Sequence, residues 1–195
     1  MCINENIFKF NELGLLPPGC HEVTLMDIKT FFVDNFPESK TRQSRFDCFI
    51  KFYNDLLKNV KSCIRLLIDG SFVENKVDPY DIDFIIVIDS KELTIEENNY
   101  LDNLIEKKNK YRQEYDHFNY LHENDIISKD KLYELDLFRF GCDFFRIDKI
   151  SEDHPMYNNY VNYKNYWINW WGHNRENIPK GFLNLVVDYG GLNDI

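Results

Sequence analysis

The stretch from Ile64 to Ile88 constrains the fold of this 195-residue chain more than any other segment. It contains two apolar runs of strand length, 64–68 and 84–88, and a polar loop joins them. Short apolar runs that contain β-branched residues predict buried strands. Asp81 and Asp83 precede the second run. Because placing a charge near a core costs on the order of several kcal/mol unless it is paired or binds a metal, these acids need an explanation.

Strand geometry gives Asp81 and Asp83 a shared role. Side chains two residues apart on a strand project from the same side, about 6–7 Å apart along the backbone. Two carboxylates on one side suit a hard divalent cation such as Mg²⁺. Gly70 and Ser71 follow the first run, where a tight turn can bring backbone amides and a hydroxyl to a phosphate. Metal carboxylates beside such a turn favour metal-assisted phosphoryl or nucleotidyl transfer.

These residues also match a known sequence pattern. Gly70-Ser71, nine intervening residues and then Asp81-Ile82-Asp83-Phe84 resemble the hG[GS]-x(9–13)-Dh[DE]h pattern of the DNA polymerase β-like nucleotidyltransferase superfamily. The resemblance implies an α/β (α+β) fold, with a mixed sheet of about four or five strands flanked by helices. It also implies that Gly70 and Ser71 hold the β- and γ-phosphates of an NTP such as ATP. Asp81 and Asp83 would bind two Mg²⁺ ions, with Mn²⁺ as an alternative.

A wider set of short matches resembles a family of small uncharacterised bacterial proteins of the same superfamily. They span most of the chain: Leu16 to Gly19, Gly70 to Val73, Asp143 to Phe145, Glu152 to Pro155, and Pro179 to Gly181. The superfamily normally adds a third carboxylate from a later strand, which helps to bind metal and to activate the attacking hydroxyl. Asp143 and Asp136 are both candidates, and Asp143 is favoured because it belongs to the wider match. Asp69 is interpreted as a strand-end residue rather than a ligand.

Lys180 is the favoured basic residue of this site, since it precedes the last predicted strand and could neutralise the triphosphate. An exposed lysine in a turn is an equal alternative. Arg42 and Arg45 lie mostly off the apolar stripe of a predicted helix. They are interpreted as part of a solvated face, with contact to a phosphate as the alternative.

Periodicity and turn residues predict the other elements. Residues 1–22 are expected to be an irregular arm that lays Leu15 and Leu16 on the domain. The expected helices span 24–35, capped by Thr24, then 39–61, then 94–108, which begins with a capping box, and one that starts at the cap Asp153 and ends at Gly172. The expected strands are 63–68, 84–88, 135–140, 142–147 and 182–187, and 109–132 is expected to be loop with some helix.

Bulk composition limits the class of protein. The length suits one domain over 1–195, divided into an N-terminal arm and helices (1–61) and a catalytic core (62–195). Hydrophobic residues make up 44%, which can build a substantial core, and the net charge of −10 argues against non-specific coating of nucleic acid. The five scattered cysteines favour free thiols in the cytoplasm. No signal peptide or membrane span is expected.

Together these features predict a Mg²⁺-dependent nucleotidyltransferase that transfers NMP from an NTP to a hydroxyl. The catalytic residues are Asp81, Asp83 and Asp143. The acceptor could be a tRNA or other RNA end, a protein side chain or a small molecule, and the resemblance allows a role with a protein partner in a toxin–antitoxin or defence system. One alternative is an inactive nucleotide- or partner-binding module of the same fold. Another is an interaction protein built around the Tyr- and Trp-rich segment 157–171.

Overall fold

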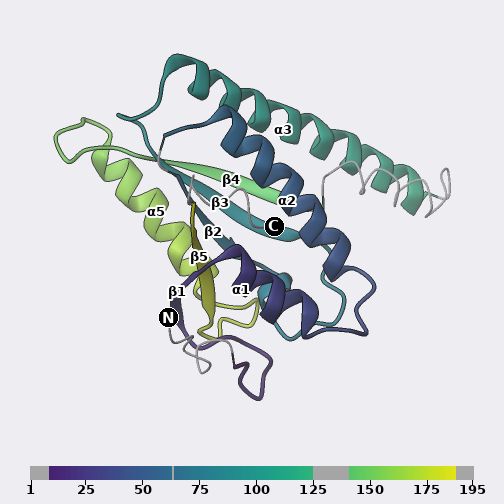
Figure 1. Ribbon diagram of the computed structural model, residues 1–195. Coiled ribbons are helices and arrows are strands. Elements are labelled where there is room, and N and C mark those ends of the chain that lie inside the picture. The colour runs from purple at the N-terminus through teal and green to yellow at the C-terminus, as the bar shows by residue number, and fades with distance from the viewer. Residues whose placement is uncertain (1–8, 63, 125–140, 188–195) are drawn as a thin grey trace.

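The computed structural model describes residues 9–62, 64–124 and 141–187. At its centre lies one mixed sheet of five strands, in the order β1-β5-β2-β3-β4 (Figure 1). β1 runs parallel to β5, and β3 runs parallel to β4, whereas β2 is antiparallel to both of its neighbours, β5 and β3. The sheet confirms the expected mixed α/β architecture. The strands are β1 (Gly19–Val23), β2 (Ile64–Asp69), β3 (Ile82–Asp89), β4 (Cys142–Lys149) and β5 (Gly181–Val186).

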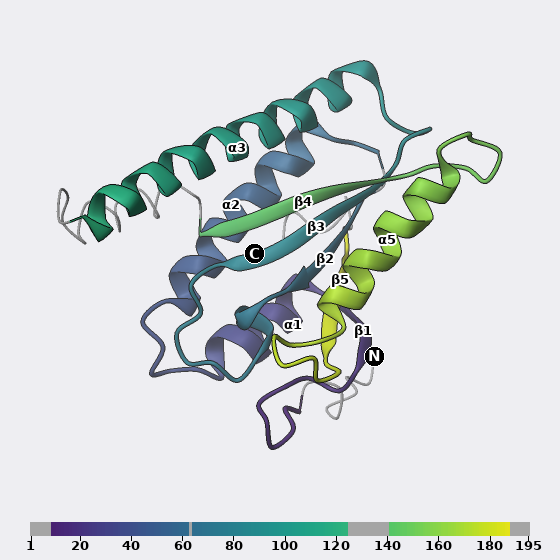
Figure 2. The same cartoon turned by 180° about the vertical axis from the view of Figure 1, so that it is seen from behind.

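Helices cover both faces of the sheet (Figures 1 and 2). They are α1 (Leu25–Lys29), the π-helix η1 (Thr30–Asp34), α2 (Arg42–Asn59), the 3-10 turn η2 (Ser71–Val73), α3 (Ile95–Glu123) and α5 (Tyr157–Trp171). Residues of α1, η1, α2 and α3 join one hydrophobic cluster, and those of α5 join a second. Alternation along β3 separates the two clusters, because Phe84 and Ile86 enter the first whereas Ile85 and Val87 enter the second.

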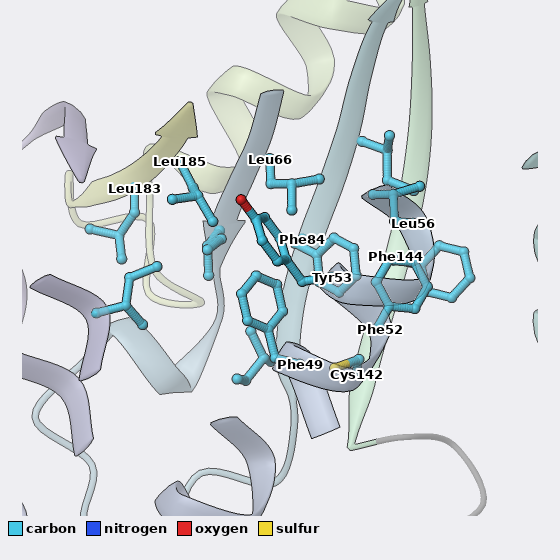
Figure 3. Packing of buried hydrophobic residues seen from close by; sticks show 14 of the residues in the cluster. Phe49, Phe52, Tyr53, Leu56, Leu66, Phe84, Cys142, Phe144, Leu183 and Leu185 are labelled. Atoms are coloured by element: carbon cyan, nitrogen blue, oxygen red, sulfur yellow. The ribbon is translucent and has the colours of Figure 1, made fainter. Parts of the chain in front are cut away.

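The apolar stripe predicted for residues 39–61 lies at the centre of the larger cluster (Figure 3). Phe49 and Phe52 of α2 pack on Phe84 of β3, with ring centroids 5.4 and 5.0 Å away. Phe52 also lies 4.9 Å from the ring of Phe144 on β4. Such ring pairs contribute about 1 kcal/mol each beyond the burial of their surface. α2 therefore fixes the two strands that carry Asp83 and Asp143.

The solvated face predicted for Arg42 and Arg45 on α2 is wrong, because both side chains are buried. The Arg42 guanidinium donates five hydrogen bonds, all to backbone carbonyls, at 2.6–3.2 Å. One acceptor is Phe32 of η1, and the others are Phe72, Glu74 and Lys76. Five donors in a rigid fork fit this set of carbonyls, which a lysine could not satisfy. Arg42 therefore ties the segment after Ser71 to the first helices.

The N-terminal arm is more regular than the sequence indicates. Leu15 and Leu16 are buried, as expected, but residues 19–23 form β1 instead of irregular chain. The strand was missed because it is short and polar, and only its pairing with β5 makes it a strand. Thr24 then caps α1 through the reciprocal bonds it makes with Asp27, which confirms that helix start.

Two predicted element boundaries need correction. The capping box at Thr94 and Glu97 is confirmed, but α3 continues beyond residue 108 to Glu123. Asp153 does not cap the last helix; α5 begins at Tyr157, and its N-cap residue, Met156, makes no side-chain cap bond. Its predicted end at Gly172 is confirmed. The strand expected over 135–140 and the alternative acid Asp136 lie outside the described residues.

Candidate active site

Asp69, Asp83 and Asp143 form a row across three neighbouring strands. Asp69 of β2 pairs with Asp83 of β3, and Asp83 pairs with Asp143 of β4. Paired residues on adjacent strands point to the same face, and such strands lie about 4.8 Å apart. Strand alternation puts this row on the face covered by α5, because Ile85 and Phe145, two residues further along their strands, belong to the α5 cluster. The row stands where β2 ends and β3 and β4 begin.

Asp81 adds a fourth carboxylate beside this row. It lies just before β3 and is partly buried, as is Asp83. The negative charge of Asp81 acts on Asp83 and raises the pKa of that carboxyl, after the larger effect of burial. The two acids singled out in the sequence therefore lie close to each other, and the backbone register brings Asp143 next to them.

Gly70 lies against the carboxylate of Asp83. A Cβ atom added to Gly70 would lie 1.9 Å from Oδ2 of Asp83, so any other residue there would require the Asp83 carboxylate to move. Gly70 also has a φ of 76°, in the region that glycine adopts most readily. Ser71 then opens η2 and is partly buried. The Gly70-Ser71 turn and the acids, which the sequence pattern links, are thus in direct contact through Gly70 and Asp83.

Within the carboxylate row, Asp83 is electrostatically unfavourable when it is ionised. Burial raises the pKa of Asp83 to about 7, with further increases from the charges of Asp81, Asp143 and Asp69 and an opposing effect from Lys180. Like charges brought together in a partly desolvated site favour protonation or the binding of a cation. The buried Asp83 carboxylate destabilises the fold when it is ionised. A residue kept at such a cost is a candidate for a functional role.

This electrostatic strain predicts a pH dependence of stability in the absence of metal. Because the pKa of Asp83 is raised from 3.8, the folded state holds its proton more tightly than the unfolded state between about pH 4 and pH 7. The free energy of unfolding should therefore fall on the order of 3 kcal/mol as pH rises through this window. Urea titrations in EDTA would measure it, and Asp83→Asn should remove most of the slope. An equal slope in that variant would contradict the prediction.

Lys180 is not the exposed turn lysine that the sequence allowed. Its side chain is 3% exposed, and its ammonium lies 2.6 Å from Oδ1 of Asp69 and 3.0 Å from Oε1 of Glu74. Asp69 ends β2 as expected, but it is buried, and burial raises its pKa to about 6 against the opposing effect of Lys180. The pair joins the start of β5 to the end of β2, immediately before Gly70.

Loss of the Lys180 charge should destabilise the fold in a pH-dependent way. In Lys180→Met, Asp69 would remain buried without its cation, and we expect a loss of about 2–3 kcal/mol near neutral pH. The loss should be smaller near pH 5, where Asp69 accepts a proton instead. Urea unfolding at both pH values tests this, and the double variant Asp69→Asn/Lys180→Met should recover part of the loss. A loss independent of pH would mean that packing, not charge, is the cause.

Asp143 has a basic partner that sequence reasoning missed. The ammonium of Lys108, on α3, lies 2.7 Å from Oδ1 of Asp143 and 3.7 Å from the ring centroid of Phe145. It also donates to the carbonyl of Phe144. Lys108 stands in a polar stretch at the point where the helix was expected to end, so only the longer α3 and its place beside the edge strand reveal the contact.

The chain matches one family model over residues 8–186, that of a family of unknown function, DUF6932. The chain belongs to this family. The matched range of DUF6932 covers all five strands and every carboxylate of the row. Searches of curated proteins and of solved structures found no match.

The fit of the DUF6932 site to a metal ion is partial. Its oxygen donors are the kind that Mg²⁺ prefers. Over the described ranges, however, no three His, Cys, Asp or Glu side chains form a group that could hold a metal ion. Lys108 already places a positive charge on Asp143. To bind a metal ion, the site would therefore need Lys108 to move away from Asp143. It would also need a substrate to supply further oxygen ligands.

His154 and the aromatic residues of α5 make contacts that are common in folded proteins. His154 is exposed and accepts a hydrogen bond on Nδ1 from the backbone of Met156, which fits a residue before a helix. On α5, Trp171 packs against the sheet, whereas Tyr166 and Trp170 are exposed and stack on each other. No helix within the described part of the chain has both the length and the apolar character needed to cross a membrane.

Proposed function

We propose that this chain is a metal-dependent nucleotidyltransferase with a polymerase β-like core. The observation that carries the proposal is the contact between Gly70 and the Asp83 carboxylate, in register with Asp143 on the next strand. A turn able to hold phosphate thereby adjoins the acids suited to a cation, which is the juxtaposition that transfer from a nucleotide requires. The raised pKa of Asp83 supports a bound cation beside that carboxylate.

Each residue has a defined role in this proposal. Asp81, Asp83 and Asp143 would hold two Mg²⁺ ions, which supply charge neutralisation and Lewis-acid activation when bound. Asp143 would accept the proton of the acceptor hydroxyl, whose oxygen forms a bond to the α-phosphorus of the NTP. The bond from that phosphorus to the bridging oxygen breaks, and pyrophosphate leaves. Gly70 and Ser71 would hold the departing phosphates, while Lys180 acts indirectly, by holding Asp69 at the base of the turn.

Calorimetric titration of NTPs, with and without Mg²⁺, tests the proposal. We expect binding that requires Mg²⁺ or Mn²⁺ and that disappears in Asp81→Asn/Asp83→Asn. Asp89→Asn is a matched control, since Asp89 ends the same strand away from the row and pairs with Lys149. If no NTP binds in a metal-dependent way, the enzyme proposal fails.

The second candidate is a nucleotide-binding module of the same fold that has lost catalysis. The ion pair between Lys108 and Asp143 favours it, because it occupies the third carboxylate with a protein cation. Metal-dependent NTP binding without transfer of label to any acceptor would support this module over the enzyme. Incubation of labelled NTPs with cell extract covers RNA ends, protein side chains and small molecules as acceptors, including a partner from a toxin–antitoxin or defence pair.

A further inference from the structure

Arg45 is a buried arginine without a hydrogen bond or ion pair to any residue that the structure describes. Its residue exposure is 3%, and its Nε atom is buried without a hydrogen-bond acceptor. Among the residues that the structure describes, the guanidinium forms neither a hydrogen bond nor an ion pair. Arg42, three residues earlier on the same helix, makes five hydrogen bonds. Burying an unpaired charge is costly, so a native fold retains one only where something else compensates.

Gly141 leaves room for the Arg45 side chain just before β4. Gly141 has a φ of 62°, and a Cβ atom there would lie 2.8 Å from Cδ and 3.4 Å from Nη1 of Arg45. The carbonyl of Gly141 accepts a hydrogen bond from the backbone of Ile82, the residue between Asp81 and Asp83. The guanidinium therefore lies where β3 and β4 begin, next to the candidate site.

One ring contact and one electrostatic effect describe the position of the Arg45 guanidinium. The ring centroid of Tyr80, a residue that is 43% exposed, lies 6.0 Å from Cζ of Arg45. Burial raises the pKa of the Cys142 thiol well above its usual value, and the charge of Asp81 adds to this effect while that of Arg45 opposes it. Cys142 therefore lies within range of both charges.

We propose that Arg45 binds a phosphate group of a substrate at the end of the sheet where β3 and β4 begin. A guanidinium presents paired N–H donors that match phosphate oxygens, and a water-poor setting strengthens such charge-assisted bonds. Gly70 and Ser71 lie at the same end of the sheet, directly after β2. This inference rests on the proposed function only for the choice of phosphate as the anion. The lack of a hydrogen bond or ion pair for the Arg45 guanidinium among the described residues does not depend on nucleotidyl transfer.

The phosphate could belong to the nucleotide or to an acceptor, and inorganic probes separate these sources. Inorganic triphosphate, orthophosphate and AMP would be titrated against thermal unfolding of the full chain in EDTA, at matched ionic strength. Wild type should be stabilised, and the apparent affinity should fall at least about tenfold in Arg45→Met. The control Arg175→Met removes an exposed arginine and should behave as wild type. Arg45→Lys keeps the charge and covers the case in which the methionine variant does not fold.

Every outcome bears on the proposal. Stabilisation by triphosphate alone assigns Arg45 to the nucleotide, and stabilisation by orthophosphate and AMP as well assigns it to a phosphorylated acceptor. Equal stabilisation of wild type and Arg45→Met, or none of wild type by any of these anions, overturns the proposal. Because no metal is present, these results are separate from the Mg²⁺-dependent NTP binding that decides the proposed function.

Discussion

Replacing Arg42 with methionine is expected to lower the free energy of unfolding by about 3–5 kcal/mol. The substitution leaves the carbonyls of Phe32, Phe72, Glu74 and Lys76 without their donor. It also removes the guanidinium that stacks 3.7 Å from the ring centroid of Phe36. Because a small domain is stable by only about 5–15 kcal/mol, this single change should remove a large share of the total.

Urea unfolding followed by tryptophan fluorescence would measure the effect of the Arg42 substitution. Arg42→Lys tests the reason, because an ammonium keeps the charge but cannot reach this set of carbonyls in a fixed fork, and we expect it to lose nearly as much. Arg175→Met provides the exposed-arginine control and should change stability by less than about 0.5 kcal/mol. A loss below about 1 kcal/mol in Arg42→Met would mean that water satisfies the carbonyls instead.

The double variant Asp81→Asn/Asp83→Asn is expected to lose nucleotidyl transfer by at least about a thousandfold, because cation stabilisation of the transition state contributes several kcal/mol. The same variant should be more stable than wild type by about 2 kcal/mol near pH 8 without metal, since it removes like charges that repel one another. Opposite effects on activity and stability are the signature of a site built for a ligand rather than for the fold.

Transfer of label from NTP in cell extract, together with urea unfolding in EDTA, would measure both effects of the double variant. Asp89→Asn changes the same residue type at the other end of β3 and should alter neither quantity appreciably. Transfer that survives the double substitution would mean that the chemistry belongs to other residues. Unchanged transfer with raised stability would mean that the two acids contribute neither to transfer nor to the stability of the fold.

The residues of the site that are close together in the sequence could be predicted from the sequence. The spacing from Gly70 to Asp83 reflects two adjacent antiparallel strands, so a local pattern reports a local contact. Asp143 is favoured over Asp136 only because it belongs to the wider set of short matches, and the register places it beside Asp83. The shared side of Asp81 and Asp83, by contrast, follows from strand periodicity, which depends on the chain's own neighbours.

The contacts that the sequence could not reveal are those between distant segments. Lys180 and Asp69 are separated by 111 positions, and each alone has the composition of an ordinary turn or strand end. Arg42 is indistinguishable from a solvated arginine until the carbonyls that surround it are known. β1 has a polar sequence and becomes a strand only through β5. In each case tertiary pairing outweighs local preference.

The pairing of β1 with β5 also sets an order of events during synthesis. Gly19 pairs with Gly181, and β5 separates β1 from the rest of the sheet. A nascent chain can therefore pair β2 with β3 early, but β1 has no neighbour until β5 leaves the ribosome. Until then β1 and the outer edge of β2 present unpaired backbone groups, which are the usual starting points for misassembly. Pairing over so long a separation also slows folding, so completion of the sheet should be a late step.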